Sequence, residues 1–512
     1  MNKKRNILLI ATFLSLALGA CNFGGASSTT SSSSYSSSLE SSNISSIESS
    51  SSASSSSSER KQLDPDEVLE YVEDSEHAGG LAVKAINDDI NGDLVIPSEH
   101  DGQPVTAIYR FGFNQCDYLY SVVIPDSVLL IEWDAFDGCD RLESVTLSKN
   151  LKTISAYAFK ECVSLKSIVI PDSVTELSEM TFSRCRSLES AVLGKGLTKT
   201  GRYTFDLCFH LTDVTIPDSI TEIEEYAFGY CDFVNITLPN SVTAIQYRAF
   251  DGCGRLQTIN IPKDVSHIGD GAFLLCDSLE SITVDKDNAY YTSIDGVLYS
   301  KDLKTLVVYP ANYLNNFTLL NSVTTIGNCA FAGAVELAHY EIPNHVTTIG
   351  DSAFSHCKKL VSVDIPNSVT TIGMYCFSGC ELLRSLILPN GLQSIESGLF
   401  YGCYALRYVG IPDSVTFIGS SVFESCSSLS YIVLPKSITK FGIWIFDYYL
   451  KEIFYEGNEE EWNNIELSST TSYIYKEETI LYFYSETEPT SEGHYWHYVN
   501  NVRTIWGNAN NN

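Results

Sequence analysis

The chain has 512 residues, and its 63 acidic side chains outnumber its 32 lysine and arginine side chains, which gives a formal net charge of -31 at pH 7. So large a negative charge repels phosphate groups, which argues against nucleic acid as a partner and against direct attraction to anionic lipid headgroups. This length often makes three or four domains, but a repeat array grows by addition, so one elongated domain is enough here.

Residues 1–20 have the basic start and short apolar run of a secretory signal peptide. The apolar run, 7–18, is too short to span a bilayer as a stable helix. It leads into Leu-Gly-Ala-Cys, which resembles the lipobox of bacterial lipoproteins, where the peptide is cut before the Cys and the thiol is lipidated. We therefore predict a lipid anchor at Cys21. The alternative is an ordinary secretory signal followed by an incidental Cys.

The stretch 21–58, which starts with the anchor Cys, is predicted to be a disordered tether. Within it, 22 of the 32 residues from 27 to 58 are serine. Such a segment buries too little apolar surface to offset the entropy lost on ordering. It would hold the folded part away from the membrane.

Residues 59–109 are predicted to form an N-terminal cap. A helical turn is expected over 66–72, and the stretches 94–97 and 105–108 match the strand positions of the repeat that follows. The regular array begins directly after them.

An internal repeat of 23 residues, once 22, occupies most of the chain and is marked by a phenylalanine in each unit. The fourteen marker residues are Phe113, Phe136, Phe159, Phe182, Phe205, Phe228, Phe250, Phe273, Phe331, Phe354, Phe377, Phe400, Phe423 and Phe446.

Each unit has apolar residues spaced by three or four around the marker Phe and by two near its end, where an Ile-Pro-Asp-Ser sequence is typical of a turn. This pattern predicts two short strands joined by a tight helical or 3₁₀ turn. No unit could bury its apolar side chains alone, so the units must stack. We predict a solenoid over 110–450, capped at both ends.

The interval between Phe273 and Phe331 holds 12 residues more than two periods. We predict an irregular coil at about 285–320 that carries a hairpin, because Asp295-Gly296 lies between two apolar runs. Asp285 and Asp287 are spaced like the start of a calcium loop, but Tyr290 stands where such a loop needs Gly, which favours a solvated turn.

The stretch 451–507 is predicted to be a C-terminal cap, with one helical turn near 459–462 and an aromatic strand at 480–484. A cap of this kind covers the open edge of the last coil, which would otherwise pair with another chain. The Asn-rich end, 508–512, is predicted to be disordered.

The repeat C-x-x-L-x-x-[VI]-x-[IL]-P-x-[SG]-[VIL]-[TQ]-x-[IL]-x-x-x-[AC]-F resembles the BspA-like leucine-rich repeats of bacterial surface proteins over residues 94–446. Asp-Gly-Val-Leu-Tyr at 295–299 and Tyr-Trp-His-Tyr-Val at 495–499 are also similar to that family. The resemblance implies a curved, β-rich leucine-rich-repeat solenoid displayed on the bacterial surface, with adhesion or ligand binding in some members. It implies no catalytic residues.

Twelve of the 15 cysteines lie three residues after a marker Phe. Ala334 and Tyr449 take the same place in two coils, so the position favours a small or apolar group over the chemistry of a thiol. Stacked side chains would hold neighbouring Cβ atoms too far apart for an unstrained disulfide. We predict buried free thiols, with oxidation of the ladder as the alternative.

The sequence contains no G-x-S-x-G elbow, H-E-x-x-H, Walker loop or G-x-G-x-x-G, so we predict neither an enzyme nor a cofactor. No metal site is predicted either. Cys376 and Cys380 lack further ligands for zinc, and His494 and His497 fit an ordinary pair in the cap.

A candidate binding site is a row of aromatic side chains two residues before the marker Phe. Recurring at one position of the repeat, they would stack, and Tyr and Trp are favoured as binding anchors. The alternative is that Tyr suits a half-buried position in a β-rich coil. The row contains Phe111, Tyr157, Tyr203, Tyr226, Tyr375 and Trp444. The outward strand positions, by contrast, form a polar face of mostly small residues.

These features predict a surface-anchored, non-enzymatic binding protein, either an adhesin or a module that binds proteins or glycans. The expected partners are an extracellular protein or glycan and, through Cys21, the membrane. The alternatives are a passive structural envelope lipoprotein and a lipoprotein that captures substrate for a neighbouring transporter or enzyme.

Overall fold

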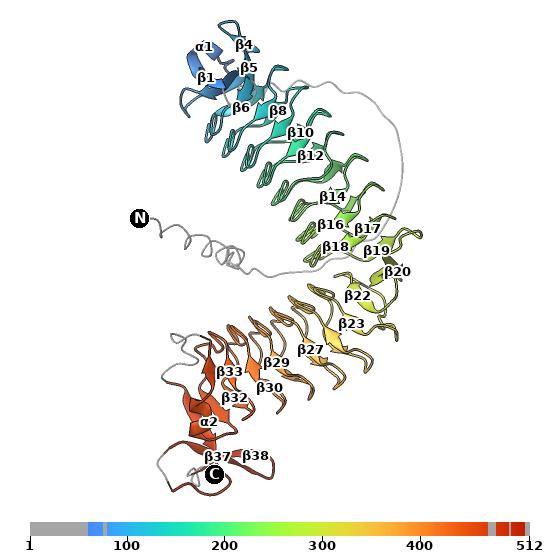
Figure 1. Ribbon diagram of the computed structural model, residues 1–512, viewed down its shortest axis with the longest axis vertical. Coiled ribbons are helices and arrows are strands. Elements are labelled where there is room, and N and C mark those ends of the chain that lie inside the picture. The colour runs from blue at the N-terminus through green and yellow to red at the C-terminus, as the bar shows by residue number, and fades with distance from the viewer. Residues whose placement is uncertain (1–59, 75–78, 469–477, 491–492, 507–512) are drawn as a thin grey trace, which may run out of the picture. The chain divides into compact units, whose positions relative to one another are not determined.

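The computed structural model describes residues 60–74, 79–468, 478–490 and 493–506, which all belong to one compact unit, 59–512. The predicted signal peptide, Cys21, the Ser-rich tether and the Asn-rich tail lie outside the described residues. Successive coils of the repeat lie side by side (Figure 1). The fold is the predicted β-rich leucine-rich-repeat solenoid.

Most regular coils contribute two short strands, and each of these strands pairs in parallel with its equivalent in at least one neighbouring coil. Ser144, for example, pairs with Ser121, which lies 23 residues earlier. We call the strand that ends before the Ile-Pro turn the first ladder. Its members are β3 (Gly92–Val95), β6 (Leu119–Val123), β8 (Ser144–Thr146), β10 (Ser167–Val169), β12 (Ser190–Val192), β13 (Asp213–Thr215), β15 (Asn235–Ile236), β17 (Thr258–Ile261), β19 (Ser281–Val284), β24 (His339–Glu341), β26 (Ser362–Asp364), β28 (Ser385–Ile387), β30 (Tyr408–Gly410) and β32 (Tyr431–Leu434).

The second ladder is formed by the strand that precedes the marker Phe. Most of its strands are two residues long, because the chain turns again at once. Its members are β5 (Gln103–Ile108), β7 (Leu130–Ile131), β9 (Thr153–Ile154), β11 (Glu176–Leu177), β14 (Glu222–Ile223), β16 (Ala244–Ile245), β18 (His267–Ile268), β23 (Thr325–Ile326), β25 (Thr348–Ile349), β27 (Thr371–Ile372), β29 (Ser394–Ile395), β31 (Phe417–Ile418) and β33 (Lys440–Phe441).

At the N-terminal end, α1 (Pro65–Val68) is followed by β1 (Leu69–Asp74), β2 (Gly80–Ala85) and the small strand β4 (Glu99–His100). The prediction of a helical turn over 66–72 is wrong in its second half. Leu69 starts a strand because β1 pairs antiparallel with β2, which in turn pairs with β5. Non-local pairing with β2 overrides the local helical pattern.

A third set of contacts, which we call the turn ladder, joins the coils around the marker Phe. The N–H of Phe113 donates to the carbonyl of Ala135 in the next coil at 2.7 Å, and Gln115 N–H donates to Asp137 O at 2.8 Å. Within a coil, Cys116 N–H donates to Phe113 O at 3.2 Å, which is the i to i−3 bond of a 3₁₀ turn. Left-handed residues interrupt these turns, so no continuous helix forms in them.

The marker phenylalanines form two stacks in the core. Successive rings lie 4.9 to 6.0 Å apart, with interplanar angles of 3 to 16°. Such parallel, offset stacking adds to the apolar area that each ring buries. One stack runs from Phe113 to Phe273, and the other runs from Phe331 to Phe446.

The twelve ladder cysteines are buried free thiols, as predicted. Eleven of them place Sγ 3.0 to 3.3 Å from the carbonyl oxygen of the marker Phe in the previous coil, as Cys162 does with Phe136. A thiol is a weak donor, so the position gains a hydrogen bond as well as a good fit. Ala334 is also buried, but Tyr449 is exposed at the end of the array.

The long interval between the two stacks contains β20 (Tyr291–Ile294), β21 (Val297–Ser300) and β22 (Thr305–Val308). β20 and β21 form an antiparallel hairpin closed by Asp295-Gly296, both with positive φ, which suits a tight two-residue turn. β22 then pairs in parallel with β23 and restarts the second ladder. Ahead of the hairpin, the buried Asn288 amide donates to the carbonyls of Pro262 and Val265.

At the C-terminal end, β34 (Glu452–Tyr455), β36 (Ile480–Tyr484), β37 (Tyr495–Val499) and β38 (Val502–Ile505) extend the first ladder, and β38 pairs antiparallel with β37. β35 (Glu466–Leu467) extends the second ladder. The helical turn predicted near 459–462 is α2 (Glu459–Asn463), which starts with a capping box between Asn458 and Glu461.

Candidate functional site

The aromatic row lies on backbone of unusual conformation. All fourteen residues two positions before a marker Phe have φ between 50 and 66°. Non-glycine residues rarely adopt this left-handed region, and Tyr and Trp have no local preference for it. Twelve of the fourteen row residues, all except Gly271 and Trp444, donate their N–H to the next coil, so the turn ladder holds the backbone in this conformation. The row therefore accepts many side chains at a fixed backbone position.

Three of the predicted row members are held by partners within the protein. The hydroxyls of Tyr157 and Tyr203 donate to Glu179 and Glu225 at 3.3 and 3.1 Å. Tyr226 stacks on Tyr203, with ring centroids 4.8 Å apart. Burial and then the neighbouring glutamates raise the pKa of Tyr157 and Tyr203, so both stay neutral donors. These three rings therefore take part in contacts between neighbouring coils.

The other three predicted members present their rings to solvent. Phe111 is 51% exposed, Tyr375 is 43% exposed and Trp444 is 61% exposed. The Tyr375 ring lies against Gly398, where a Cβ atom would come within 2.1 Å of it. The row is therefore not one continuous surface. Exposed aromatic rings lie toward its two ends, and rings that are held by other side chains of the protein lie between them.

The structure adds aromatic residues that the sequence analysis did not include. Trp133 is 48% exposed and packs edge to face on Phe111 at 5.5 Å. Tyr247 packs edge to face on Tyr226 at 5.9 Å, with the Arg248 guanidinium 5.3 Å from its ring centroid. Both lie three residues before a marker Phe, so extending the search by one position of the repeat would have found them.

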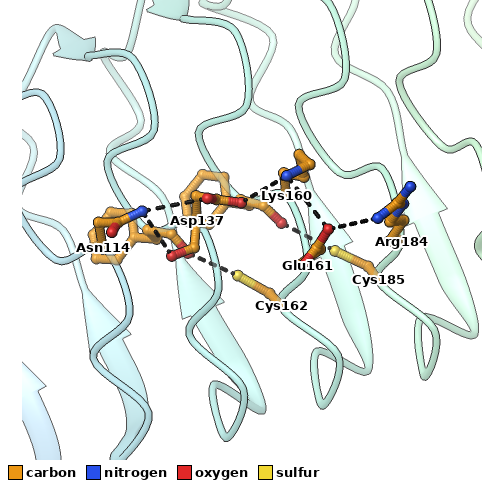
Figure 2. Close-up of polar contacts among 9 residues, drawn as sticks. Asn114, Asp137, Lys160, Glu161, Cys162, Arg184 and Cys185 are labelled. Atoms are coloured by element: carbon orange, nitrogen blue, oxygen red, sulfur yellow. Dashed lines mark hydrogen bonds and ion pairs between the residues drawn. The ribbon is translucent and has the colours of Figure 1, made fainter. Parts of the chain in front are cut away.

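Beside the row, a chain of polar contacts crosses four coils (Figure 2). Asn114 Nδ2 donates to Asp137, which pairs with Lys160 at 3.4 Å, and Glu161 pairs with Lys160 at 3.3 Å and with Arg184 at 2.8 Å. Burial raises the pKa of Asp137. In Glu161 burial is outweighed by the two cations, which lower its pKa. Because the two carboxylates and the two cations pair with one another, this surface has little net charge with which to attract a ligand.

The outward positions of the first ladder remain open, and they are polar at most coils. Ser144, Thr146, Asp213 and Thr215 are exposed. Val169 at 61% and Ile387 at 70% are exposed apolar exceptions.

No group of three or more His, Cys, Asp or Glu side chains in the described residues could hold a metal ion. His497 stacks on Trp506 with ring centroids 3.7 Å apart, and His494 packs edge to face on Tyr482. Cys376 and Cys380 are both buried free thiols. Within the described parts of the chain, no helix is long and apolar enough to cross a membrane.

The parallel ladders, the stacked apolar core and the repeated surface positions define a leucine-rich-repeat solenoid. A family model described as BspA type leucine rich repeat region (6 copies) matches residues 106–233, 198–309, 307–430 and 371–477. Together these matches span well over half of the sequence, so the chain belongs to the BspA-type leucine-rich-repeat family. Members of this family are cell-surface proteins that serve as binding modules and are generally not enzymes.

Solved structures are similar along most of the chain. A leucine rich cell surface protein from Faecalibacterium prausnitzii is 29% identical, with a TM-score of 0.56, and the match covers 78% of this chain and 97% of that one. A leucine-rich repeat protein from Eubacterium ventriosum is 23% identical, with a TM-score of 0.44 and coverage of 71% and 92%. The pneumococcal vaccine antigen PcpA is 20% identical, with a TM-score of 0.40 and coverage of 82% and 92%. No curated protein matches the sequence.

Proposed function

We propose that this protein is a bacterial surface adhesin, anchored through a lipid on Cys21, which binds an extracellular protein or glycan with the side of its solenoid. The observation that carries the proposal is the exposure of Phe111, Trp133, Tyr375 and Trp444 at neighbouring positions of the repeat. Exposed Tyr and Trp side chains bury much area on binding at little cost in conformational entropy.

Two further features support binding at these positions. Phe111 and Tyr375 donate their backbone N–H groups to the next coil, so these exposed rings sit on a rigid support, which lowers the entropy that a partner must offset. The fold also tolerates Ser, Asp, Met, Arg and Cys at the same position, so the aromatic rings are not required there for folding.

The test uses residues 59–512, made without the lipid, against a panel of matrix proteins, mucin glycans and cell-wall polymers. We expect saturable binding to one class of partner. Changing Phe111, Tyr375 and Trp444 together to Ser should weaken that binding at least tenfold. The matched control changes Tyr157, Tyr203 and Tyr226 to Ser, and it should leave affinity within about twofold because these half-buried rings are held by contacts within the protein.

Equal affinity for both triple variants and the wild type would contradict the role of the row. A folded protein that binds nothing in the panel would favour the passive envelope component. Tight binding of a small glycan or peptide alone would favour the substrate-capturing lipoprotein.

A further inference from the structure

The junction between the two Phe stacks interrupts the turn ladder. In the regular coils, N–H groups on alternate residues around the marker Phe donate to carbonyls of the next coil. At the last coil of the first stack, the N–H groups of Gly271 and Phe273 have no acceptor among the described residues. Gly271 has a left-handed backbone, and so does Leu275 four residues later.

The first coil of the second stack has backbone carbonyls that lack their usual donors. In regular coils, the acceptors in the next coil are the carbonyls three residues before, one residue before and one residue after its marker Phe. For the marker Phe331, these are the carbonyls of Asn328, Ala330 and Ala332. Tyr309 fills one of these places, because its N–H donates to Ala330 O at 2.7 Å. The carbonyls of Asn328 and Ala332 have no donor among the described residues.

A cavity of about 340 Å³ lies between these two walls. Its lining includes Gly271 and Phe273, whose N–H groups have no acceptor, and Asn328 and Ala332, whose carbonyls have no donor, among the described residues. The volume falls at the lower end of the range of about 300 to 1,000 Å³ for small-molecule sites.

The remaining lining combines apolar and polar groups. Ile268, Val307 and Val308 supply apolar surface. Asp270 and Asn328 are exposed at one side, and Asn328 Nδ2 donates to Asp270 Oδ2 at 2.9 Å. Asp270 disfavours an anionic ligand, whereas a carboxylate beside an amide suits hydroxyl groups, which both donate and accept.

Gly271 keeps the cavity open. It occupies a row position at φ 64°, where other coils carry Tyr, Met or Arg. A Cβ atom here would contact Arg248 at 3.3 Å and Cys329 Sγ at 3.6 Å. In the neighbouring array the Tyr375 ring at this position lies over the next coil, so a ring at position 271 would occupy the space between the stacks.

A secondary amide matches these walls, since its carbonyl accepts from one side and its N–H donates toward the other. Backbone N–H and C=O groups without partners are unfavourable, so a ligand that pairs them gains affinity. We propose that the cavity between the two Phe stacks binds an N-acetylated amino sugar. The acetamido group meets the backbone groups of Gly271 and Asn328, its methyl group packs on the valines, and the ring hydroxyls meet Asp270.

The experiment titrates the full chain with N-acetylglucosamine, and with glucose and N-acetyl-alanine-methylamide as comparisons, by isothermal calorimetry. We expect saturable binding of N-acetylglucosamine and at least tenfold weaker binding of glucose, which lacks the acetamido group. The variant Gly271→Tyr should lose at least tenfold in affinity. The matched control Ser421→Tyr places the same ring at the same position of a regular coil, and it should bind like the wild type.

Three results would overturn the proposal: no saturable binding to protein that melts like the wild type, equal affinity for glucose, or unchanged affinity in Gly271→Tyr. Binding of the peptide amide in preference to the sugar would overturn it as well, since it would assign the cavity to peptides. The site is independent of the exposed aromatic rings, so changing Phe111, Tyr375 and Trp444 to Ser should not affect this titration.

Discussion

The buried carboxyl group of Asp251 and the half-buried one of Asp206 are the least expected side chains in this solenoid. Asp251 is 1% exposed, and its Oδ2 pairs with Arg248 at 3.1 Å, while its Oδ1 has no hydrogen-bond partner among the described residues. Burial raises the pKa of Asp251 to about 6. Burial and the charge of Asp251 together raise the pKa of Asp206 to about 7. Both carboxyl groups therefore keep their protons to a higher pH than an ordinary Asp does.

This pair makes stability depend on pH. An unfolded Asp ionises near pH 4, whereas folded Asp206 keeps its proton to about pH 7. The stability that this proton contributes is present below pH 4 and is lost as the pH rises through 7. Asp206→Asn should therefore raise the free energy of unfolding at pH 8 by on the order of 2 kcal/mol and change it little at pH 4. Urea denaturation at both pH values measures this difference.

The control for this prediction is Asp213→Asn, at an exposed position of the first ladder. It should alter stability by less than about 0.5 kcal/mol at either pH. If the free energy of unfolding of Asp206→Asn had the same pH dependence as that of the wild type, the Asp206 carboxyl would not be the cause of this dependence.

Among the elements, the C-terminal strands end the array because they bury aromatic side chains over its last coil. Trp496 in β37 is fully buried and donates from Nε1 to Tyr455 O at 3.0 Å. It packs edge to face on Phe454, which stacks on Tyr482 at 4.7 Å. These three rings form a small core of their own. One tryptophan therefore holds β37 onto β34 and β36.

Trp496→Ala should destabilise this cap by about 3 to 5 kcal/mol, because it removes a buried ring and leaves a carbonyl unpaired. Hydrogen exchange should become faster in β34 and β36 but not in the first stack. Trp444→Ala serves as the control, since that ring is 61% exposed and its loss should cost less than about 0.5 kcal/mol. Equal exchange in both variants would show that the cap is held elsewhere.

In the molecule as a whole, the apolar interior is divided into two large cores. One contains buried side chains from Leu63 to Leu298, and the other contains those from Val297 to Ile465. The division falls within β21, where alternation turns Leu298 toward the first core and Val297 and Tyr299 toward the second. In solenoids stability comes from nearest-neighbour contacts, so a weakened junction separates two cooperative units.

We expect the two arrays to respond separately to core mutations. Phe159→Ala should lower the stability of the first array by about 3 to 5 kcal/mol, and Phe377→Ala should lower that of the second by a similar amount. Hydrogen exchange followed by mass spectrometry in increasing denaturant reports each array separately. If either variant destabilised both arrays equally, the solenoid would unfold as one unit despite the junction.

Much of the fold could be predicted from periodicity alone. The spacing of the marker Phe, the Cys three residues later and the Ile-Pro turn defines a coil, and every coil must stack to bury these residues. That reasoning predicted the two strand ladders, the buried thiols and the hairpin at Asp295-Gly296, because each depends on burial or on local turn chemistry. The family follows from the same repeat.

Three features could not be predicted in this way: the division of the aromatic row into exposed and held rings, the raised pKa of Asp206 and the cavity beside Gly271. Each depends on which residues of separate coils face one another, and only the packing of the coils determines that. The positive φ of Tyr157 and Tyr203 shows the reason most clearly. Hydrogen bonds to the next coil hold these residues in the left-handed region, which their side chains do not favour. The sequence of a single coil therefore does not predict this conformation.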